Sequence, residues 1–518
     1  MSPLGASPLG ARKLGAQTLG GLRPGVPSPG YDRDGLIAGI VHIGVGAFHR
    51  SHQAMVLDQL LEQGCARDFA ICGLGLLERD RVLKEVLKSQ DYLYTLLVKH
   101  PDGTREPRII GSIVDFVLAP DDPAAAVERL ADITTRIVSL TITEGGYNID
   151  PTTGGFDAAN PNVIEELTPG APPTTMFAFV TAALRLRRDR GQTPFTVMSC
   201  DNIPGNGDLT RAMVMSFAQS ADPDLAAWIG EHVAFPNSMV DRITPVTTKE
   251  DIEHVAELIG LQDAWPVVCE PFFQWVIEDH FTDGRPPLDA AGVQLVVDVA
   301  PYELMKLRLL NGSHQALAYF GWLSGFRYVH DAARDPAMAG LLRRYMATEA
   351  APTLPPVPGM DLDAYQDQLI ERFSNSEVRD TVARLCAESS DRIPKWLVPV
   401  IRDQLAHGGG VECSAAVVAS WARYAEGVDE NGETFAVVDQ LSKELVETAR
   451  RQHDDPLAFV RNRRLFGDLI EEPGFTEPYL RALHSLFEHG AHATVTALSA
   501  KPRPAFEPPH AAGTSRTV

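Results

Sequence analysis

The chain has 518 residues, of which 44% are hydrophobic and 22% are charged, the balance of a globular protein of about two to four domains. Its 68 acidic and 46 basic side chains give a formal net charge of -22, which repels phosphate backbones and anionic lipid. We therefore expect no nucleic-acid or membrane partner. No apolar run reaches the roughly 18 residues of a membrane helix, and the N-terminus lacks the apolar core of a secretory signal. The six cysteines form no C-x-x-C pair and have no zinc-ligand spacing, so we expect buried thiols in a reducing cytoplasm.

Both ends of the chain are predicted to be loosely structured. Residues 1–35 repeat a Leu-Gly-Ala unit among prolines and glycines, and they carry too little apolar surface to offset the entropy of ordering. Residues 501–518 are rich in Pro, Ser and Thr. We expect a disordered extension over 1–35 and a loose tail over 501–518, with no chemistry in either.

Residues 36–297 alternate short apolar runs with helical patterns. The expected strands lie in Ile40–Gly46, Phe69–Leu76, Ile137–Thr143 and Phe195–Cys200, and the expected helices include Gln53–Gln63 and Thr174–Arg190. Continuous apolar strands separated by helices are typical of a parallel sheet that is covered on both faces. This part of the chain is therefore predicted to be an α/β domain.

A turn of two glycines follows the first expected strand, at Gly44-Val45-Gly46. Such glycines let backbone N–H groups approach a pyrophosphate, which the next helix N-terminus stabilises. The dinucleotide fingerprint has a third glycine where this chain has His49, so the motif alone is equally typical of a plain strand-ending turn. Its place in the first strand–helix unit favours a Rossmann-type domain that binds NAD. The residues predicted to contact the cofactor here are Ile43, Gly44, Val45, Gly46, Phe48, His49 and Arg50.

Acidic residues follow the second expected strand. A carboxylate there can accept hydrogen bonds from the adenosine ribose 2′-OH and repel a 2′-phosphate. Glu78 and Asp80 both occupy this place, and either could take the role, which favours NAD. Arg79 between them could pair with a 2′-phosphate, so NADP use stays open. Glu78 and Asp80 could also simply cap the start of a solvent-exposed helix, where acidic residues are common.

Residues 298–500 have few strand-like runs and many helical patterns, such as Tyr302–Phe320 and Glu412–Tyr424. We predict a mainly α-helical domain that supplies substrate-binding and catalytic groups.

The segment PYELMKLRLLNGSH (301–314) has the strongest chemical pattern. At 100° per residue of an α-helix, Glu303, His314 and Asn311 lie about 60°, 80° and 140° from Lys306. A lysine desolvated among leucines has a lowered pKa and can take the hydroxyl proton of an alcohol as hydride leaves carbon. An asparagine amide can donate to the developing alkoxide, and a histidine can orient sugar hydroxyls. The pattern predicts a metal-free dehydrogenase, although a solvated polar stripe would have the same spacing.

Six segments together resemble the polyol-specific long-chain dehydrogenases. They are GVGAFHRSHQA (44–54), ITEGGYNID (142–150), VMSCDNIPGNG (197–207), FPNSMVDRITP (235–245), VVCEPFFQWVIED (267–279) and KLRLLNGSH (306–314). The resemblance covers about residues 36–500. It implies NAD-dependent interconversion of D-mannitol and D-fructose without zinc, by a monomeric enzyme. It also implies Lys306 as the general base, with Asn202 and Asn311 as donors to the oxyanion and His314 beside them.

The same resemblance implies further roles. Asp241 and Arg384 would contact the polyol, and Glu303 and Glu144 would serve proton passage between the lysine and solvent. The family has a lysine contact where this chain has Arg392, with Lys395 nearby, so we expect these two side chains to contact substrate. Arg79 departs from the more acidic pattern of strictly NAD-using relatives.

Several other readings stay open at this level. The substrate could be D-arabinitol, D-sorbitol or a hexuronate such as fructuronate, whose carboxylate Arg384, Arg392 or Lys395 could bind. The chain could be a nucleotide-binding sensor that has lost catalysis, although a sensor has no need of a base. A metal-dependent alcohol dehydrogenase is a further alternative, because His42, His49 and His52 lie close together in the sequence.

Overall fold

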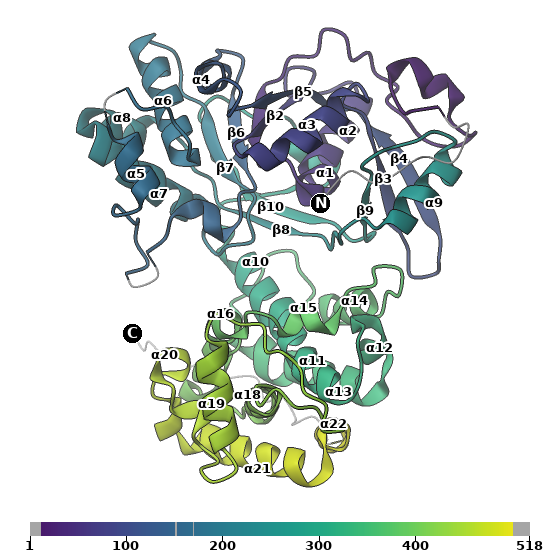
Figure 1. Ribbon diagram of the computed structural model, residues 1–518, viewed down its shortest axis with the longest axis vertical. Helices are drawn as coiled ribbons and strands as arrows, with labels where there is room; N and C mark the ends of the chain where they lie inside the picture. The colour runs from purple at the N-terminus through teal and green to yellow at the C-terminus, as the bar shows by residue number, and fades with distance from the viewer. Residues whose placement is uncertain (1–11, 151–152, 169, 501–518) are drawn as a thin grey trace, which may run out of the picture. The chain divides into compact units, whose positions relative to one another are not determined.

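The computed structural model describes residues 12–150, 153–168 and 170–500. It has two compact units, one ending at Glu303 and the other beginning at Leu304 (Figure 1). The division falls inside a helical segment that starts at Ala300, a few residues beyond the boundary expected from sequence. The first unit is α/β and the second is helical, so the predicted fold class is confirmed. No helix in the described ranges has the length and apolarity to cross a membrane.

A parallel five-stranded sheet is the frame of the first unit. Its strands are β1 (Ile40–Ile43), β2 (Ile71–Gly75), β5 (Ile113–Leu118), β6 (Ile137–Leu140) and β7 (Thr196–Ser199). Their order is β5-β2-β1-β6-β7, and every neighbouring pair is parallel. All four expected strands are present. We did not predict β5, whose apolar run is interrupted by Asp115.

Side chains of this sheet alternate between two cores, as the two-residue period of a strand requires. On β1, Val41 and Ile43 pack in one cluster with helices α4, α6, α7 and α8, whereas Ile40 packs in the other with α2 and α3. Because both faces are buried, the strands are apolar at nearly every position. This explains why they could be recognised as continuous apolar runs.

Two small mixed sheets complete the first unit. One has the order β11-β10-β8 and the other β4-β3-β9. Their strands are β3 (Tyr94–Lys99), β4 (Arg105–Ile110), β8 (Ser238–Asp241), β9 (Val267–Cys269), β10 (Gln274–Glu278) and β11 (Gln294–Val296). The α-helices of this unit are α1 (Ala47–Ser51), α2 (Gln53–Glu62), α3 (Arg81–Lys88), α4 (Pro123–Ala131), α5 (Pro161–Glu166), α6 (Met176–Asp189), α7 (Asn206–Ala221), α8 (Pro223–His232) and α9 (Lys249–Ile259).

Residues 12–35 pack against the first unit, so the prediction of disorder is wrong over this range. Leu14 is buried against Ile259 and Leu261, and its amide donates to the carbonyl of Gln262 at 2.8 Å. Further along, the Tyr31 hydroxyl donates to Asp58 at 2.7 Å. These partners are distant in sequence, and composition does not reveal them. Residues 1–11 and the tail expected over 501–518 lie outside the described residues.

The second unit is built from helices. After α10 (Ala300–Met305) and a π-helical segment (Lys306–Asn311) come α11 (Gly312–Leu323), α12 (Val329–Arg334), α13 (Pro336–Tyr345), α14 (Leu362–Phe373), α15 (Val382–Cys386), α16 (Ser389–Trp396), α17 (Val398–Ala406), α18 (Glu412–Tyr424), α19 (Ser442–Arg451), α20 (Arg463–Phe466), α21 (Pro473–His489) and α22 (Ala491–Ser499). Both α11 and α18 are buried along almost their whole length, which is the property of central helices. The π-helical segment Lys306–Asn311 therefore leads directly into α11, in the core of this unit.

Candidate functional site

The strand order of the parallel sheet reverses beside β1. The chain builds β2 and β5 on one side of β1, and then β6 and β7 on the other. In open parallel sheets, ligands bind outside the carboxyl ends of the strands at such a switch point. The loops that begin at Gly44 after β1 and at Thr141 after β6 therefore define the candidate cofactor site.

The glycine turn after β1 fits a dinucleotide. Gly44 has a φ of 91°, and a Cβ there would lie 2.2 Å from the carbonyl oxygen of Thr141. The fold itself therefore requires glycine at this position. Gly46 differs, because a Cβ there would meet nothing closer than 3.8 Å. The open space at Gly46 is of the kind a pyrophosphate needs to approach the backbone, so the residues present fit NAD.

His49 stands where the fingerprint has its third glycine, and it packs α1 against the sheet. Its ring stacks on that of His42 with centroids 3.5 Å apart, and its side chain is buried. The two ring nitrogens of His42 lie 2.8 Å from the hydroxyls of Ser139 and Thr141. Burial lowers the pKa of His42 to about 3 and that of His49 well below its usual value. Both rings are neutral at pH 7, so they add no positive charge to the turn.

The three histidines of this region do not form a metal-binding cluster. His42 uses both nitrogens on hydroxyl groups, and His52 lies 3.3 Å from the carbonyl of Gln274. Over residues 12–150, 153–168 and 170–500, no group of three or more His, Cys, Asp or Glu side chains is arranged to hold a metal ion.

Arg50 points into the protein. Its guanidinium donates to the carbonyls of Trp265 at 2.6 Å and Gly46 at 3.3 Å, and it lies 5.2 Å from the centre of the Tyr94 ring. We expected Arg50 to contact the cofactor. Its side chain shapes the turn through the Gly46 carbonyl, and a contact of Arg50 with the cofactor stays a prediction.

The carboxylates after β2 have different surroundings. Glu78 is exposed and forms a two-point ion pair with Arg81 at 2.5 and 2.9 Å. Asp80 folds back over the strand end, where it accepts a hydrogen bond from Leu77 N at 3.0 Å. A Cβ on Gly75 would lie 2.7 Å from the Asp80 Cβ, so Asp80 sits directly over the end of β2. This placement favours Asp80 over Glu78 as the ribose contact. Arg79 is exposed.

Asp201 organises the loops after β6 and β7, and our sequence reasoning missed it. Its carboxylate accepts the amides of Ile142 and Thr143 at 3.0 and 2.8 Å, and the Tyr147 hydroxyl at 2.8 Å. Because Asp201 directly precedes Asn202, these hydrogen bonds join the turn that carries Glu144 to the loop that carries Asn202. Both of these predicted site residues are exposed at the sheet's carboxyl edge. The only signal in the sequence was the position of Asp201 within the SCDN motif.

Two further predicted residues are Glu303 and Asp241, the second of which belongs to the sheet β11-β10-β8. Both carboxylate oxygens of Glu303 are 3.1 Å from the amide of Gly205, at the N-terminus of α7. Asp241 is buried at the end of β8 and pairs in register with Gln274 of β10. Glu303 therefore lies beside the loop that carries Asn202.

In the second unit, Lys306–Asn311 is π-helical and His314 follows in α11. Lys306, Asn311 and His314 are 7%, 5% and 8% exposed. Over Lys306–Asn311 the chain forms a π-turn, so the α-helical arc of about 140° predicted between Lys306 and Asn311 is wrong. In a π-turn the hydrogen bonds join residues five apart, which is the spacing of Lys306 and Asn311. Those two side chains therefore lie on one face of the segment.

Arg384 is held by a carboxylate that we did not predict. Its guanidinium forms a two-point ion pair with Asp380, with Nε 2.6 Å from Oδ1. Burial raises the pKa of Asp380, but the hydrogen bonds and charge of Arg384, with the charge of His314, bring it below the ordinary value. Asp380 is therefore ionised at neutral pH and balances the positive charge of Arg384.

The other two cations predicted to contact substrate, Arg392 and Lys395, also form hydrogen bonds within the protein. Arg392 donates to the carbonyls of Arg384 and Leu385 at 3.1 and 3.2 Å, and it lies over the ring of Trp396. Lys395 donates to Asp391 one helical turn away at 2.7 Å.

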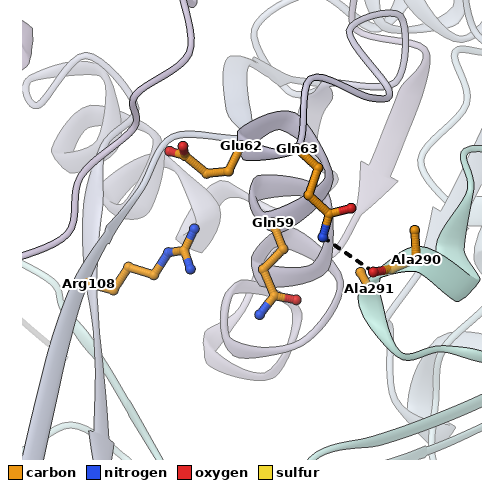
Figure 2. Close-up of a pocket in the computed structure, with 6 residues that line it drawn as sticks. All are labelled: Gln59, Glu62, Gln63, Arg108, Ala290 and Ala291. Carbon is orange, nitrogen blue, oxygen red and sulfur yellow. Dashed lines mark hydrogen bonds between the residues drawn. The ribbon is translucent and has the colours of Figure 1, made fainter.

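A surface hollow of about 430 Å³ lies elsewhere on the first unit (Figure 2). It is lined by Gln59, Glu62, Gln63, Arg108, Ala290 and Ala291. Since α2 begins at the carboxyl edge of the sheet and runs back along it, its last turn lies at the opposite edge. The charged groups of the hollow are also engaged, because Arg108 pairs with Asp58 and Glu62 accepts the Gly30 amide. The hollow is therefore separate from the candidate cofactor site.

Comparison with known families gives two matches that together cover most of the chain. The family described as the mannitol dehydrogenase Rossmann domain matches residues 38–290. The family described as the mannitol dehydrogenase C-terminal domain matches residues 298–487.

Individual relatives agree with these matches. A mannitol 2-dehydrogenase of Pyricularia oryzae is 43% identical over 473 residues, which are 90% of this chain and 94% of that protein. The structure of a Pseudomonas fluorescens mannitol 2-dehydrogenase, a ternary complex with NAD and D-mannitol, is 44% identical with a TM-score of 0.84. The match covers 95% of this chain and all of that one. A substrate-free D-sorbitol dehydrogenase structure is 38% identical with a TM-score of 0.87, and covers 93% of this chain and all of that one.

The placement of Asp80 generates a test of cofactor choice. Replacing Asp80→Ala should lower the ratio of kcat/KM with NAD to kcat/KM with NADP by about tenfold or more, because a charge-assisted hydrogen bond contributes roughly 1.5–3 kcal/mol. Initial rates with each cofactor measure the ratio. The matched variant Glu78→Ala should change it less, since Glu78 is paired with Arg81. An equal change in both variants would show that Asp80 is not the main ribose contact.

Proposed function

Because the chain belongs to the mannitol dehydrogenase family, we propose that it is an NAD-dependent mannitol 2-dehydrogenase that interconverts D-mannitol and D-fructose. The glycine turn at the strand switch point, with its open space at Gly46, supports a dinucleotide site. The names of the relatives support the polyol substrate. The observation that carries the proposed chemistry is the buried π-turn with Lys306 and Asn311 on one face.

Lys306 is proposed as the general base. Burial at 7% exposure disfavours the charged ammonium, and a neutral amine can accept the hydroxyl proton of the alcohol. Bound NAD would accept the hydride that leaves the carbon bearing this hydroxyl. Asn311, on the same face as the amine, can donate an amide hydrogen to the oxygen as negative charge develops on it. In the direction of reduction, the lysine returns the proton to that oxygen.

The remaining predicted residues are assigned supporting roles. We propose Asn202 as the second donor to the oxyanion, and His314 and Asp241 as contacts for the polyol hydroxyls. Glu303 and Glu144 are proposed to pass the proton between the lysine and solvent. Glu303 has direct structural support for its location, since it is fixed to the Gly205 amide beside the Asn202 loop.

A neutral polyol suits the second unit better than a hexuronate. The carboxylate of a hexuronate would need a cation, and Arg384, Arg392 and Lys395 were the candidates for this role. Each of them already has a partner, and that of Arg384 is a two-point carboxylate, Asp380. A substrate carboxylate would have to compete with Asp380 for the same guanidinium.

D-sorbitol is the second candidate substrate, because a related structure is that of a D-sorbitol dehydrogenase. The burial of Lys306 and Asn311 disfavours a catalytically inactive sensor. Burying polar side chains costs free energy, and a protein that only binds a nucleotide does not need a buried lysine.

We further propose that the enzyme acts as a monomer in the cytoplasm, which light scattering and cell fractionation would test.

Substrate choice is tested by the oxidation of NADH at 340 nm. We expect fast oxidation with D-fructose and slow oxidation with D-fructuronate and D-xylulose, and unchanged rates in EDTA. NADPH in place of NADH should give slower turnover. Preference for fructuronate would contradict the assignment of a neutral polyol. NAD binding without turnover of any polyol or ketose would favour the sensor.

The role of the lysine is tested by substitution. Lys306→Ala should lower kcat for D-mannitol oxidation by roughly 10²-fold or more, as loss of a general base does. The control is Lys443→Ala, which removes an exposed lysine on α19 of the same unit and should leave kcat unchanged. Near-normal turnover of Lys306→Ala would exclude it as the base.

The Asp380–Arg384 pair generates a prediction about specificity. Asp380→Asn removes the charge that balances Arg384, so the guanidinium can bind a substrate carboxylate. The ratio of kcat/KM for fructuronate to that for fructose should rise about tenfold, the equivalent of roughly 1.4 kcal/mol. The control Asp468→Asn breaks an exposed ion pair with Arg402 and should not change the ratio. An unchanged ratio in Asp380→Asn would mean that Arg384 does not face the substrate.

A further inference from the structure

The helix that carries Lys306 departs from α geometry at one carbonyl. In an α-helix the amide of Gly312 would donate to the carbonyl of Arg308, four residues earlier. Here it donates to the carbonyls of Leu307 and Leu309. The Arg308 carbonyl is therefore left without its usual helical partner, and in a buried segment such a group needs a replacement.

The replacement is a tyrosine from a different helix. The hydroxyl of Tyr345, at the end of α13, donates to the Arg308 carbonyl at 2.9 Å. Tyr345 is completely buried, and burial raises the pKa of its hydroxyl, which stays protonated and able to donate. The bond replaces the α-helical bond that the π-turn lacks.

Gly312 makes room for this hydroxyl. A Cβ at position 312 would lie 2.2 Å from the Tyr345 oxygen and 3.0 Å from its ring carbon Cζ. The φ of Gly312 is -61°, so the glycine is not required by the backbone conformation. The glycine of the NGSH sequence is therefore explained by the approach of Tyr345.

The side chain of Arg308 holds the same residue from another direction. Its guanidinium donates to the carbonyl of Thr353 at 2.8 Å and forms an ion pair with Asp403 at 2.6 Å. The carbonyl and the side chain of Arg308 are thus both bound by groups outside α10, the π-helical segment and α11. This arrangement fixes the segment at the point where it leaves α geometry.

We propose that Tyr345 is a positioning residue for catalysis, which holds the π-turn through the Arg308 carbonyl and so keeps Lys306 and Asn311 on one face. The inference rests on the proposed roles of those two residues. If the segment relaxed to an α-helix, Asn311 would lie about 140° around the axis from Lys306. An amide in that direction could not donate to the oxygen from which the lysine takes a proton. Tyr345 itself touches neither substrate nor cofactor in this role.

The direct test is Tyr345→Phe, which removes one oxygen and keeps the ring. We expect kcat for D-mannitol oxidation to fall about tenfold or more, approaching the roughly 10²–10³-fold loss of an oxyanion donor. NAD affinity, measured by fluorescence titration, should be unchanged. The pH at which kcat/KM reaches half its maximum should also shift, because the surroundings of the base change.

A matched control separates positioning from a general loss of stability. Tyr319 is equally buried, and its hydroxyl bonds Gln315 and Ser389 at 2.6 Å each rather than a helix carbonyl. Tyr319→Phe should lower the melting temperature comparably but leave the pH profile of kcat/KM unmoved. Equal effects of the two variants on kcat and on the pH profile would overturn the proposal.

Substitution of the glycine gives a second test through the same contact. Gly312→Ala places a methyl group against the Tyr345 hydroxyl, so kcat should fall. In the double variant Gly312→Ala/Tyr345→Phe the closest clash is gone, and the combined loss should be smaller than the product of the single losses. Independent, multiplicative losses would show that the two residues do not act through one contact.

A structural readout distinguishes this proposal from the proposed function. A crystal structure of Tyr345→Phe should show the Gly312 amide returned to the Arg308 carbonyl. A π-turn that persists in this variant would overturn the positioning role, whatever the activity. If instead Lys306→Ala kept its turnover, the proposed base would be wrong while the effect of Tyr345 on the helix could still be confirmed from the structure.

Discussion

One hydrogen bond in the second unit governs the geometry of the proposed chemistry. The Gly312 amide donates five residues back to Leu307, and the Arg308 carbonyl that it passes over is bound by Tyr345. This replaces an α-turn by a π-turn and brings Lys306 and Asn311, which an α-helix would separate, to the same face. A lysine that takes a proton and an amide that stabilises the resulting oxyanion must address one oxygen atom, so they need to share a face.

The first unit is organised by a comparable constraint at its sheet. The Gly44 turn, the stacked rings of His42 and His49, and the inward guanidinium of Arg50 together fix the loop after β1. Because the two rings are neutral, any attraction for a pyrophosphate must come from backbone amides and not from these side chains. The stacking of the two histidines replaces the close helix–strand contact that a third glycine usually allows.

Charge balance distinguishes the second unit from a carboxylate-binding site. The three cations that could have clamped a hexuronate each have a partner within hydrogen-bond distance, and Asp380 neutralises Arg384. Arg384 and Lys395 each pair with a carboxylate, whereas Arg392 donates to backbone carbonyls. This is consistent with recognition of a neutral sugar alcohol.

The sequence by itself determined the elements whose signals are local. The four apolar strands could be recognised because both faces of the sheet are buried, and the glycine turn and the order of the motifs along the chain indicated the family. The burial of Lys306 was expected from its leucine neighbours. These are properties of adjacent residues, and the periodicity of strands and helices is sufficient to read them.

Only the tertiary structure decided the features that depend on distant partners. Residues 12–35 are ordered by contacts with later parts of the chain, such as those of Tyr31 with Asp58 and of Leu14 with Gln262, and composition carries no trace of these contacts. The π-turn depends on Tyr345, 37 residues beyond the carbonyl it binds. Asp201 accepts the amides of Ile142 and Thr143, nearly 60 residues earlier, which only the fold brings near it. A hydrogen bond has no periodicity in sequence when its partners belong to different elements. The placement of Lys306 and Asn311, the proposed catalytic pair, therefore follows from packing between helices, although their residue types are evident in the sequence.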